Sequence, residues 1–297
     1  MGPFYKVASA LFISFSTTTT QHQRQQREQH QAALVTSTKL DMTSAPNNNP
    51  NEAPALRKAE QNISQDICMA LVEKLQTKLR SSLEEGDDQY WIGVAGGPGS
   101  GKSTIAEGVR DLLNHADDST SSDEMVIVIP MDGWHLYKKE LIEKHGMEYG
   151  YKRRGARHTF DVQKCIADLR QAKETGEASL PTYSREISDP VPDQVLLKKN
   201  SHRVVIVEGI YILDQDDPEW KPLTELFDEK WFVKAPSRDE QKRRLLQRSM
   251  KTWHTSKAEV WGKGEAGATK RMEFNDIPNM DSVSHCEQFA DEVIINK

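Results

Sequence analysis

Residues 91–104, WIGVAGGPGSGKST, constrain the fold of this chain more than any other stretch. Gly96–Ser103 fits the pattern G-x-x-x-x-G-K-[ST] without a mismatch. A short apolar run precedes it, and apolar residues at helical spacing follow it. Glycines let consecutive backbone N–H groups turn into one concavity at a helix N-terminus, so the loop can hold a triphosphate. The stretch therefore predicts a strand, a phosphate loop (Gly96–Ser103) and a helix.

Two polar side chains of the phosphate loop have predicted roles. Lys102 can reach the β- and γ-phosphates of ATP, and Ser103 can place its hydroxyl on Mg²⁺. We therefore expect Lys102 to be catalytic and Ser103 to be a metal ligand. The expected ATP-binding residues of this stretch are Gly96, Gly97, Pro98, Gly99, Ser100, Gly101, Lys102, Ser103 and Thr104.

Several apolar, β-branched runs predict the rest of a sheet. The runs at residues 125–129, 203–207 and 231–233 are typical of strands covered on both faces. Residues 293–295 predict a last strand, and residues 64–83 predict an amphipathic helix because apolar residues recur every four positions. Helical patterns separate the strands, so we expect a three-layer α/β/α fold of the P-loop NTPase class, with a mainly parallel sheet and a helical lid.

Three further segments carry local expectations. Ser237 can cap a helix that runs to Met250, and the arginines of this helix make it a candidate lid. Residues 188–193, SDPVPD, are rich in turn-forming residues. Gly262–Gly267 fits G-x-G-x-x-G but follows no apolar strand, so we interpret it as a flexible loop beside the lid and not as a dinucleotide site.

The N-terminal residues differ in composition from the rest of the chain. Residues 1–60 contain Thr-, Gln- and Asn-rich stretches that cannot bury enough apolar surface to offset ordering entropy. We expect them to be disordered and residues 61–297 to form the phosphate-loop domain. The apolar run at 7–15 is too short to span a bilayer and is typical of a signal or transit peptide. Residues 1–41 would then be a cleaved targeting peptide, or an untranslated extension ahead of Met42.

Charge and cysteine content limit the partners and the compartment. The formal net charge is −6, which argues against a surface devoted to nucleic acid. Cys68, Cys165 and Cys286 lie far apart without metal-ligand spacing, so we expect free, buried thiols in a reducing compartment. No run is long enough to predict a membrane span. The expected location is the cytoplasm or an organelle (mitochondrion or plastid).

Two carboxylates occur where the chemistry of a phosphate loop needs them. Asp132 follows one buried strand, and Glu208 ends another. Ligands of parallel sheets bind at the carboxyl ends of the strands, so both side chains should face Lys102. Asp132 can accept the proton of an attacking hydroxyl or hold Mg²⁺, and Glu208 can hold Mg²⁺ or orient its water. The alternative for each is an ordinary turn or capping carboxylate.

Basic, hydroxyl-bearing and aromatic side chains cluster in the segments that follow the strand ends. Together they predict a pocket for a hydroxyl-bearing acceptor, although each is also typical of a solvated loop: His135, Tyr137, Arg154, His158, Tyr183 and Arg185. Arg244 and Arg248 share one face of the candidate lid helix. They can neutralise charge on a transferring phosphoryl group, with Arg244 catalytic and Arg248 binding ATP. A solvated helix face is the alternative.

The series of motifs resembles the phosphoribulokinase/uridine kinase family of phosphate-loop kinases, especially its uridine-kinase-like, nucleoside-or-sugar-kinase branch. The motifs occur in the family's order across most of the chain from about residue 90 to 280. They are GGPGSGKST at 96–104, PMDGWHL at 130–136, RRGARHTFD at 153–161, PTYSREISDPVPD at 181–193, VIVEGIYIL at 205–213 and NDIPN at 275–279.

The resemblance implies phosphorylation of a small-molecule hydroxyl with ATP and Mg²⁺. Asp132 matches the proposed base of the family, Lys102 and Ser103 match its phosphate-loop pair, and Arg244, with Arg248, matches its lid arginines. The acceptor would be a nucleoside, a sugar or a related metabolite, and a homodimer is a further expectation. The alternative is a phosphate-loop ATPase that acts as a switch or assembly factor without a metabolite acceptor.

The chain departs from well-defined uridine kinases where the acceptor would bind. Residues 132–135 read DGWH, where those enzymes carry D-S-F-Y. Tyr183 is followed by Ser-Arg-Glu instead of the Asp-Phe of their acceptor segment. The residues that read uridine therefore do not carry over, and neither do the signature residues of phosphoribulokinases or pantothenate kinases. The identity of the acceptor stays open.

Overall fold

The computed structural model describes residues 64–79, 89–115 and 124–297, which all belong to the unit Pro54–Lys297. The predictions for residues 1–60, and for the end of the helix predicted over 64–83, lie outside the described residues. Within them, residues 64–79 form a helix, as predicted.

The main sheet contains five parallel strands in the order β2-β5-β1-β6-β7. This confirms the predicted parallel sheet. Its two central strands are apolar at nearly every position because both of their faces are covered. The strands are β1 (Tyr90–Ala95), β2 (Val126–Pro130), β5 (Val204–Gly209), β6 (Glu229–Lys234) and β7 (Glu292–Ile295).

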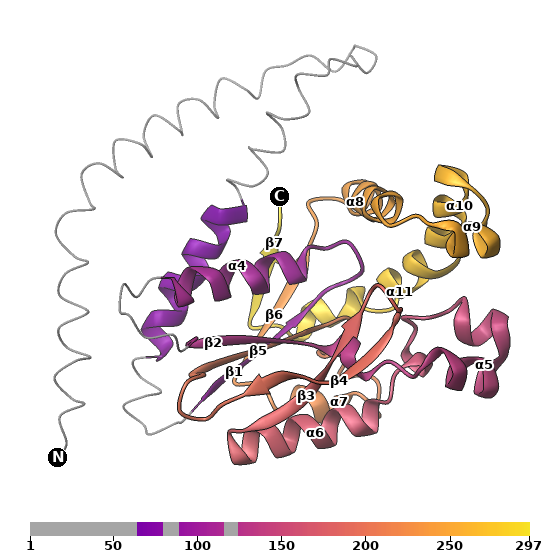
Figure 1. The fold of residues 1–297 in the computed structure, drawn as a ribbon. Coiled ribbons are helices and arrows are strands. Elements are labelled where there is room, and N and C mark those ends of the chain that lie inside the picture. Colours follow the sequence, from indigo (N-terminus) through magenta and orange to yellow (C-terminus); the bar gives the residue numbers. More distant parts are fainter. Residues whose placement is uncertain (1–63, 80–88, 116–123) are drawn as a thin grey trace, which may run out of the picture. The chain divides into compact units, whose positions relative to one another are not determined.

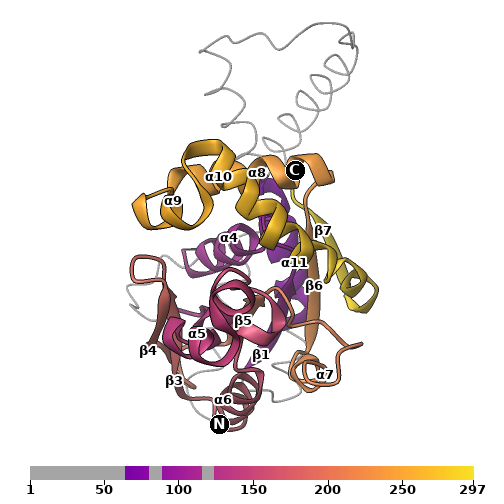
Figure 2. The same ribbon diagram turned by 90° about the vertical axis from the view of Figure 1, so that its right-hand side faces the viewer.

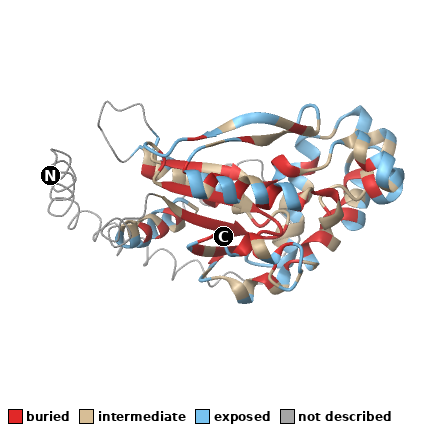
Figure 3. Ribbon diagram, turned by 90° about the horizontal axis from the view of Figure 1, so that it is seen from below, coloured by how far each residue is buried: buried red, intermediate tan, exposed pale blue. Residues whose placement is uncertain are grey.

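Helices cover both faces of the sheet (Figure 1, Figure 2). Side chains alternate between the faces along a strand, so Ile92 and Val94 of β1 join one core while Trp91 and Ala95 join the other. The first core includes α4 (Lys102–Asn114) and the helix of residues 64–79; the second includes α6 (Val162–Thr175) and α7 (Lys221–Thr224). Burial is concentrated on the strands between these helices (Figure 3). The α/β fold expected from the sequence is confirmed.

Short helices connect β2 to α6 and β6 to β7. Ser237 caps α8 by accepting a hydrogen bond from the Glu240 N–H at 3.1 Å, as predicted. The first connection contains η1 (Met131–Trp134), α5 (Lys138–Gly146), η2 (Met147–Tyr151) and η3 (Arg157–Thr159). The second contains α8 (Arg238–Lys251), α9 (Thr255–Trp261), α10 (Gly264–Arg271), η4 (Met272–Asp276), α11 (Ile277–Asp281) and η5 (Ser284–Phe289).

The turn-rich segment at 188–193 proves to be largely a strand. β3 (Ala178–Ser184) and β4 (Asp189–Leu197) pair antiparallel in a separate two-stranded sheet. Prolines are tolerated there because a two-stranded sheet leaves an edge free, and the register shifts between Leu180 and Thr182, on either side of Pro181. The abundance of turn formers hid this hairpin.

The prediction of a loop at Gly262–Gly267 was wrong. Gly262 follows the last residue of α9 with a φ of 101°, a positive value that side-chain-bearing residues rarely adopt, and α10 begins at Gly264. Glu265 lies in the first turn of α10, where a carboxylate is favourable. The glycines therefore mark the boundary between two lid helices.

Candidate active site

The phosphate loop joins β1 to α4 at the carboxyl edge of the sheet. Gly99 and Gly101 have φ values of 80° and 93°, a left-handed conformation that favours glycine. The loop is held from the lid side by Gln241 of α8, whose Nε2 donates to the carbonyl oxygen of Pro98 at 2.8 Å. The backbone of the loop is thus shaped for a phosphate at the N-terminus of α4.

Glu208, at the end of β5, contacts both functional side chains of the phosphate loop. Its Oε1 accepts a hydrogen bond from Ser103 Oγ at 3.0 Å, and its Oε2 lies 3.6 Å from Lys102 Nζ. Burial raises the pKa of Glu208, while Lys102 and the Ser103 hydroxyl oppose this rise. Oε2 is buried and has no hydrogen-bond partner among the described residues.

The arrangement fits a hard divalent cation. Asp132 lies in η1 directly after β2, and its charge acts on Glu208. Ser103, Glu208 and Asp132 offer only oxygen atoms, which are the ligands that Mg²⁺ prefers. The predicted metal ligands therefore lie at one edge of the sheet, and one of their carboxylate oxygens accepts no hydrogen bond from the described residues.

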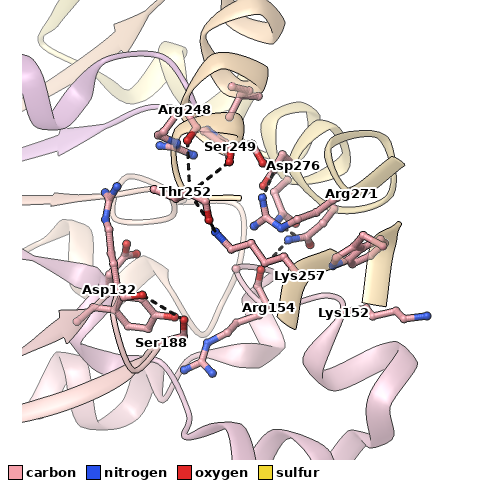
Figure 4. Close-up of a pocket in the computed structure, with 18 of the residues that line it drawn as sticks. Asp132, Lys152, Arg154, Ser188, Arg248, Ser249, Thr252, Lys257, Arg271 and Asp276 are labelled. Carbon is pink, nitrogen blue, oxygen red and sulfur yellow. Dashed lines mark hydrogen bonds and ion pairs between the residues drawn. The ribbon is translucent and has the colours of Figure 1, made fainter. Parts of the chain in front are cut away.

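A cavity of about 490 Å³, which we call the lid cavity, opens beside this edge. η1, the β3–β4 hairpin and the lid helices enclose it, and Asp132 and Arg154 lie across it from Arg248 and Lys257 (Figure 4). The structure brings most of the predicted catalytic and acceptor residues together here: Lys102, Asp132, His135, Arg154, Tyr183, Arg185 and Arg248.

His135 is held beside Asp132 as a neutral ring. Its Nδ1–H donates to the backbone oxygen of Asp132 at 2.9 Å, and its ring packs on Phe160 and Tyr183 with centroid distances of 3.9 and 5.1 Å. Burial lowers the pKa of His135, although the Asp132 carboxylate opposes it. Since Nδ1 carries the proton, Nε2 of the neutral ring is a hydrogen-bond acceptor.

Two predicted acceptor residues do not line the lid cavity. Tyr137 is 45% exposed at the start of α5, where its backbone N–H donates to Glu140. His158 donates from Nε2 to the carbonyl oxygen of Tyr149 at 2.8 Å and stacks on that ring at 4.1 Å. Their local partners hold both residues outside the cavity, and their role in acceptor binding stays a prediction.

The two predicted lid arginines have different surroundings. Arg244 donates to Glu240 at 2.6 Å and to the backbone oxygen of Asn296 at 3.0 Å. It lines a second cavity of about 540 Å³, the loop cavity, beside Ser103 and Thr104. Arg248, one turn later, lines both the loop cavity and the lid cavity. Arg248 is therefore placed where the two spaces meet.

Sequence reasoning left one wall of the lid cavity unassigned. That wall comes from the lid, and its residues include Trp253, Lys257, Trp261, Arg271, Asn275, Asp276 and Asn279. The motif NDIPN was the available signal. Its Asn275 donates from Nδ2 to the backbone oxygen of Arg154 at 2.7 Å, which ties the lid wall to the opposite wall.

Asn296, near the C-terminus, was also missed. Only 4% of it is exposed, and its Nδ2 lies 3.4 Å from the backbone oxygen of Ser100 in the phosphate loop. Its Oδ1 accepts a hydrogen bond from Ser64 Oγ at 3.0 Å. No local pattern marks this residue, because its partners are distant in the sequence.

The cysteines are free and buried, as predicted. Cys286 converges with Asp214 and His285 to within 4.8 Å, a grouping that the spacing of the cysteines did not indicate. Arg157 already pairs with the Asp214 carboxylate, so this cluster is a satisfied ion-pair network. No helix in the described ranges is long and apolar enough to cross a membrane.

Comparisons with known proteins agree with this geometry. A sequence model of the phosphoribulokinase / uridine kinase family matches residues 91–260. A Schizosaccharomyces pombe protein provisionally named as a uridine kinase is 35% identical over 48% of this chain and 59% of its own length. A pantothenate kinase of Ligilactobacillus salivarius is 29% identical over 58% of this chain and 57% of its own length. The chain thus spans somewhat more than half the length of these two relatives.

A solved structure shares the fold. It is described provisionally as a fructose transport system kinase from a Silicibacter species, and it superposes with a TM-score of 0.58 at 26% sequence identity. The alignment covers 73% of this chain and 97% of that chain.

Proposed function

Because the chain belongs to the phosphoribulokinase / uridine kinase family, we propose that it transfers the γ-phosphate of ATP to a hydroxyl group of a nucleoside, a sugar or a related metabolite. The observation that carries this proposal is the position of Asp132. It lies on the same cavity as Lys102, and that cavity continues away from the phosphate loop toward the lid. A second substrate therefore has a place beside the γ-phosphate, within reach of a carboxylate.

ATP would occupy the phosphate loop and the loop cavity. The backbone N–H groups of the loop and Lys102 would hold the phosphates, and Arg244 would lie along the nucleoside side. Arg248 suits the γ-phosphate because it lines both cavities. We therefore propose that Arg248 is catalytic and that Arg244 binds ATP, which is the reverse of the roles predicted from the sequence.

Ser103, Glu208 and Asp132 would hold Mg²⁺, which supplies charge neutralisation at the β- and γ-phosphates. The buried Oε2 of Glu208, which accepts no hydrogen bond from the described residues, supports this assignment. Its alternative partner, Lys102 at 3.6 Å, would turn to the phosphates.

The proposed transfer needs a base for the hydroxyl proton and cations that stabilise the charge on the transferring phosphoryl group. Asp132 takes the proton of the acceptor hydroxyl as its oxygen bonds to the γ-phosphorus. The bond from that phosphorus to the bridging oxygen breaks, and ADP leaves with its electron pair. Lys102 and Arg248 stabilise the charge that spreads over the phosphoryl oxygens. His135 holds the backbone oxygen of Asp132 and so orients the base.

The test is an ADP-release assay with purified protein, MgATP and a panel of nucleosides, sugars and sugar-derived alcohols. We expect one class of acceptor to stimulate ADP release. Asp132→Asn should keep ATP affinity while losing transfer by a factor of about 10² to 10⁴. Asp66→Asn, at an exposed position on the helix of residues 64–79, is the matched control and should retain activity.

ADP release that is indifferent to every acceptor and unaffected by Asp132→Asn would contradict the proposal. It would favour the alternative of an ATPase that acts as a switch or assembly factor.

A further inference from the structure

We infer that the acceptor is an anion, which carries a phosphate or carboxylate group at a distance from the reacting hydroxyl and binds it at Lys257 and Arg271 of the lid. This inference rests on the proposed kinase function and adds the chemical class of the second substrate. It starts from the charge of the lid cavity and from the way the cations on its wall are partnered.

The side chains that line the lid cavity carry a net positive charge, although the net charge of the whole chain is negative. The chain has a formal net charge of −6. Eight lysine and arginine side chains nevertheless line this one cavity, together with only two carboxylates, those of Asp132 and Asp276. A concave surface lined by one sign of charge focuses its field, which draws in ligands of the opposite sign. The cavity is therefore built for more negative charge than the protein supplies.

The lid wall holds most of the unbalanced charge. Lys257, Arg271, Arg248 and Asp276 lie together on it (Figure 4). Arg271 pairs with Asp276 at 3.0 Å. Among the described residues, Asp276 is also the one carboxylate whose charge raises the pKa of Lys257, and it raises the pKa of Arg248 more than Asp132 does. One carboxylate thus faces three cations among these described side chains.

The ammonium group of Lys257 forms its hydrogen bonds with neutral groups. Its Nζ donates to the backbone oxygen and the Oγ1 of Thr252, at 2.8 and 3.0 Å, so its partners are neutral. Burial lowers the pKa of Lys257, and the neighbouring charges of Arg271, Arg185 and Arg248 lower it further. Mutual repulsion of this kind is relieved when an anion binds between the cations.

ATP accounts for only part of this charge. Lys102, Arg185 and Arg248 line both cavities, so they are placed to meet the phosphates of ATP. Lys257 and Arg271 line the lid cavity but not the loop cavity. Lys152 pairs with Glu148, and its amino group points away from the other labelled side chains in Figure 4. Arg154 pairs with Asp189 at 3.1 Å, and Lys251 is exposed at the end of α8. Lys257 and Arg271 therefore remain for the acceptor.

The first experiment compares acceptors that differ in one anionic group. ADP release is measured with glycerate against glycerol, pantothenate against panthenol, and ribose 5-phosphate against ribose. We expect a stimulating pair in which kcat/KM is at least about tenfold higher for the anionic member. A phosphate site favours ribose 5-phosphate, and a carboxylate site favours glycerate or pantothenate. A neutral member that is as good as its anionic partner would overturn the inference.

Variants test which side chains bind the anionic group of the acceptor. Lys257→Met should raise KM for the anionic acceptor about tenfold with less effect on kcat, and Lys257→Arg should restore it. Lys139→Met is the matched control, because Lys139 is 84% exposed on α5 and does not line the cavity. An anionic preference that Lys257→Met and Arg271→Met both leave unchanged would refute the assignment to these residues.

A binding measurement separates this inference from the kinase function itself. The phosphate loop is first filled with MgADP, and glycerate, ribose 5-phosphate and inorganic phosphate are then titrated against tryptophan fluorescence, since Trp253 and Trp261 line the cavity. Saturable binding that Lys257→Met weakens would support the anion site even if no acceptor were phosphorylated. If the wild type bound none of the three and did not prefer pantothenate to panthenol, the inference would fail even where a neutral acceptor was turned over.

Discussion

The hydroxyl of Ser103 donates to the carboxylate of Glu208 at 3.0 Å, although the two residues are 105 positions apart. Ser103 is the second residue of α4, which follows β1 through the phosphate loop, and Glu208 is the second-to-last residue of β5. The two strands are parallel neighbours, with Ala95 in register with Gly209, so the two side chains meet at the same edge. The Ser103 hydroxyl and a buried carboxylate are thus positioned by the sheet itself.

Glu208→Gln should weaken the dependence of activity on Mg²⁺ without unfolding the protein. The amide keeps the shape and can still pair with Ser103, but it loses the charge that would hold the cation. We expect a fall of about 10- to 100-fold in apparent Mg²⁺ affinity. The measurement is ADP release against Mg²⁺ concentration at saturating ATP. An unchanged Mg²⁺ midpoint would remove Glu208 from the metal site.

Gly133→Ala should damage acceptor binding and spare ATP binding. A Cβ at Gly133 would overlap the backbone oxygen of Pro181, so η1 and the β3–β4 hairpin would be forced apart. We expect a loss of about 1–3 kcal/mol in the free energy of unfolding and a fall of about tenfold or more in kcat/KM for the acceptor. KM for ATP is the internal control. A rise in KM for ATP alone would show that the hairpin does not position the acceptor.

Asn296→Ala should loosen the phosphate loop from the C-terminal strand. The substitution removes the amide that faces Ser100 and leaves the Ser64 hydroxyl without its partner. We expect a loss of about 1–3 kcal/mol in the free energy of unfolding, measured with urea. Asn296→Asp is the matched variant. It keeps the acceptor for Ser64, but its negative charge beside the loop should raise KM for ATP more than alanine does.

The stability of the protein should fall with acid partly through His135. Burial lowers the pKa of its ring in the folded state below the ordinary value of 6.5, so the unfolded chain binds a proton first. This contribution is complete above the ordinary pKa and is lost as the pH falls through the lowered pKa. His135→Gln removes the titrating group while keeping a side-chain donor for Asp132.

The measurement is the free energy of unfolding in urea between pH 8 and about pH 5. Wild type should lose stability more steeply than His135→Gln over this range. The variant is expected to be less stable at pH 8, because the ring contact with Phe160 is gone. Parallel curves for the two proteins would contradict a neutral, buried His135.

Local patterns were sufficient for much of the fold. The phosphate loop has a contiguous signature, the buried strands are contiguous apolar runs, and the cap of α8 depends on residues three apart. The hairpin at 178–197 was missed because its strands contain prolines that also form turns. The boundary between α9 and α10 was missed because the same glycines occur in loops.

The candidate site divides in the same way. Asp132 and Glu208 were predictable because each is adjacent to a buried strand, and parallel strands end at one edge. Tyr137 and His158 were expected to line the acceptor pocket, but they lie outside the cavity. Their nearest partners, Glu140 and Tyr149, are only a few residues away and hold them there.

The sequence by itself determined that this chain holds a nucleotide, because the residues that cradle phosphates are contiguous and carry their own backbone geometry. Tertiary structure alone decided what faces that nucleotide. Lys257 and Arg271 come to the cavity from α9 and α10, whereas Asn296 reaches the phosphate loop from the far end of the chain. No spacing rule links such residues, since their proximity follows from the packing of the lid and the last strand against the sheet.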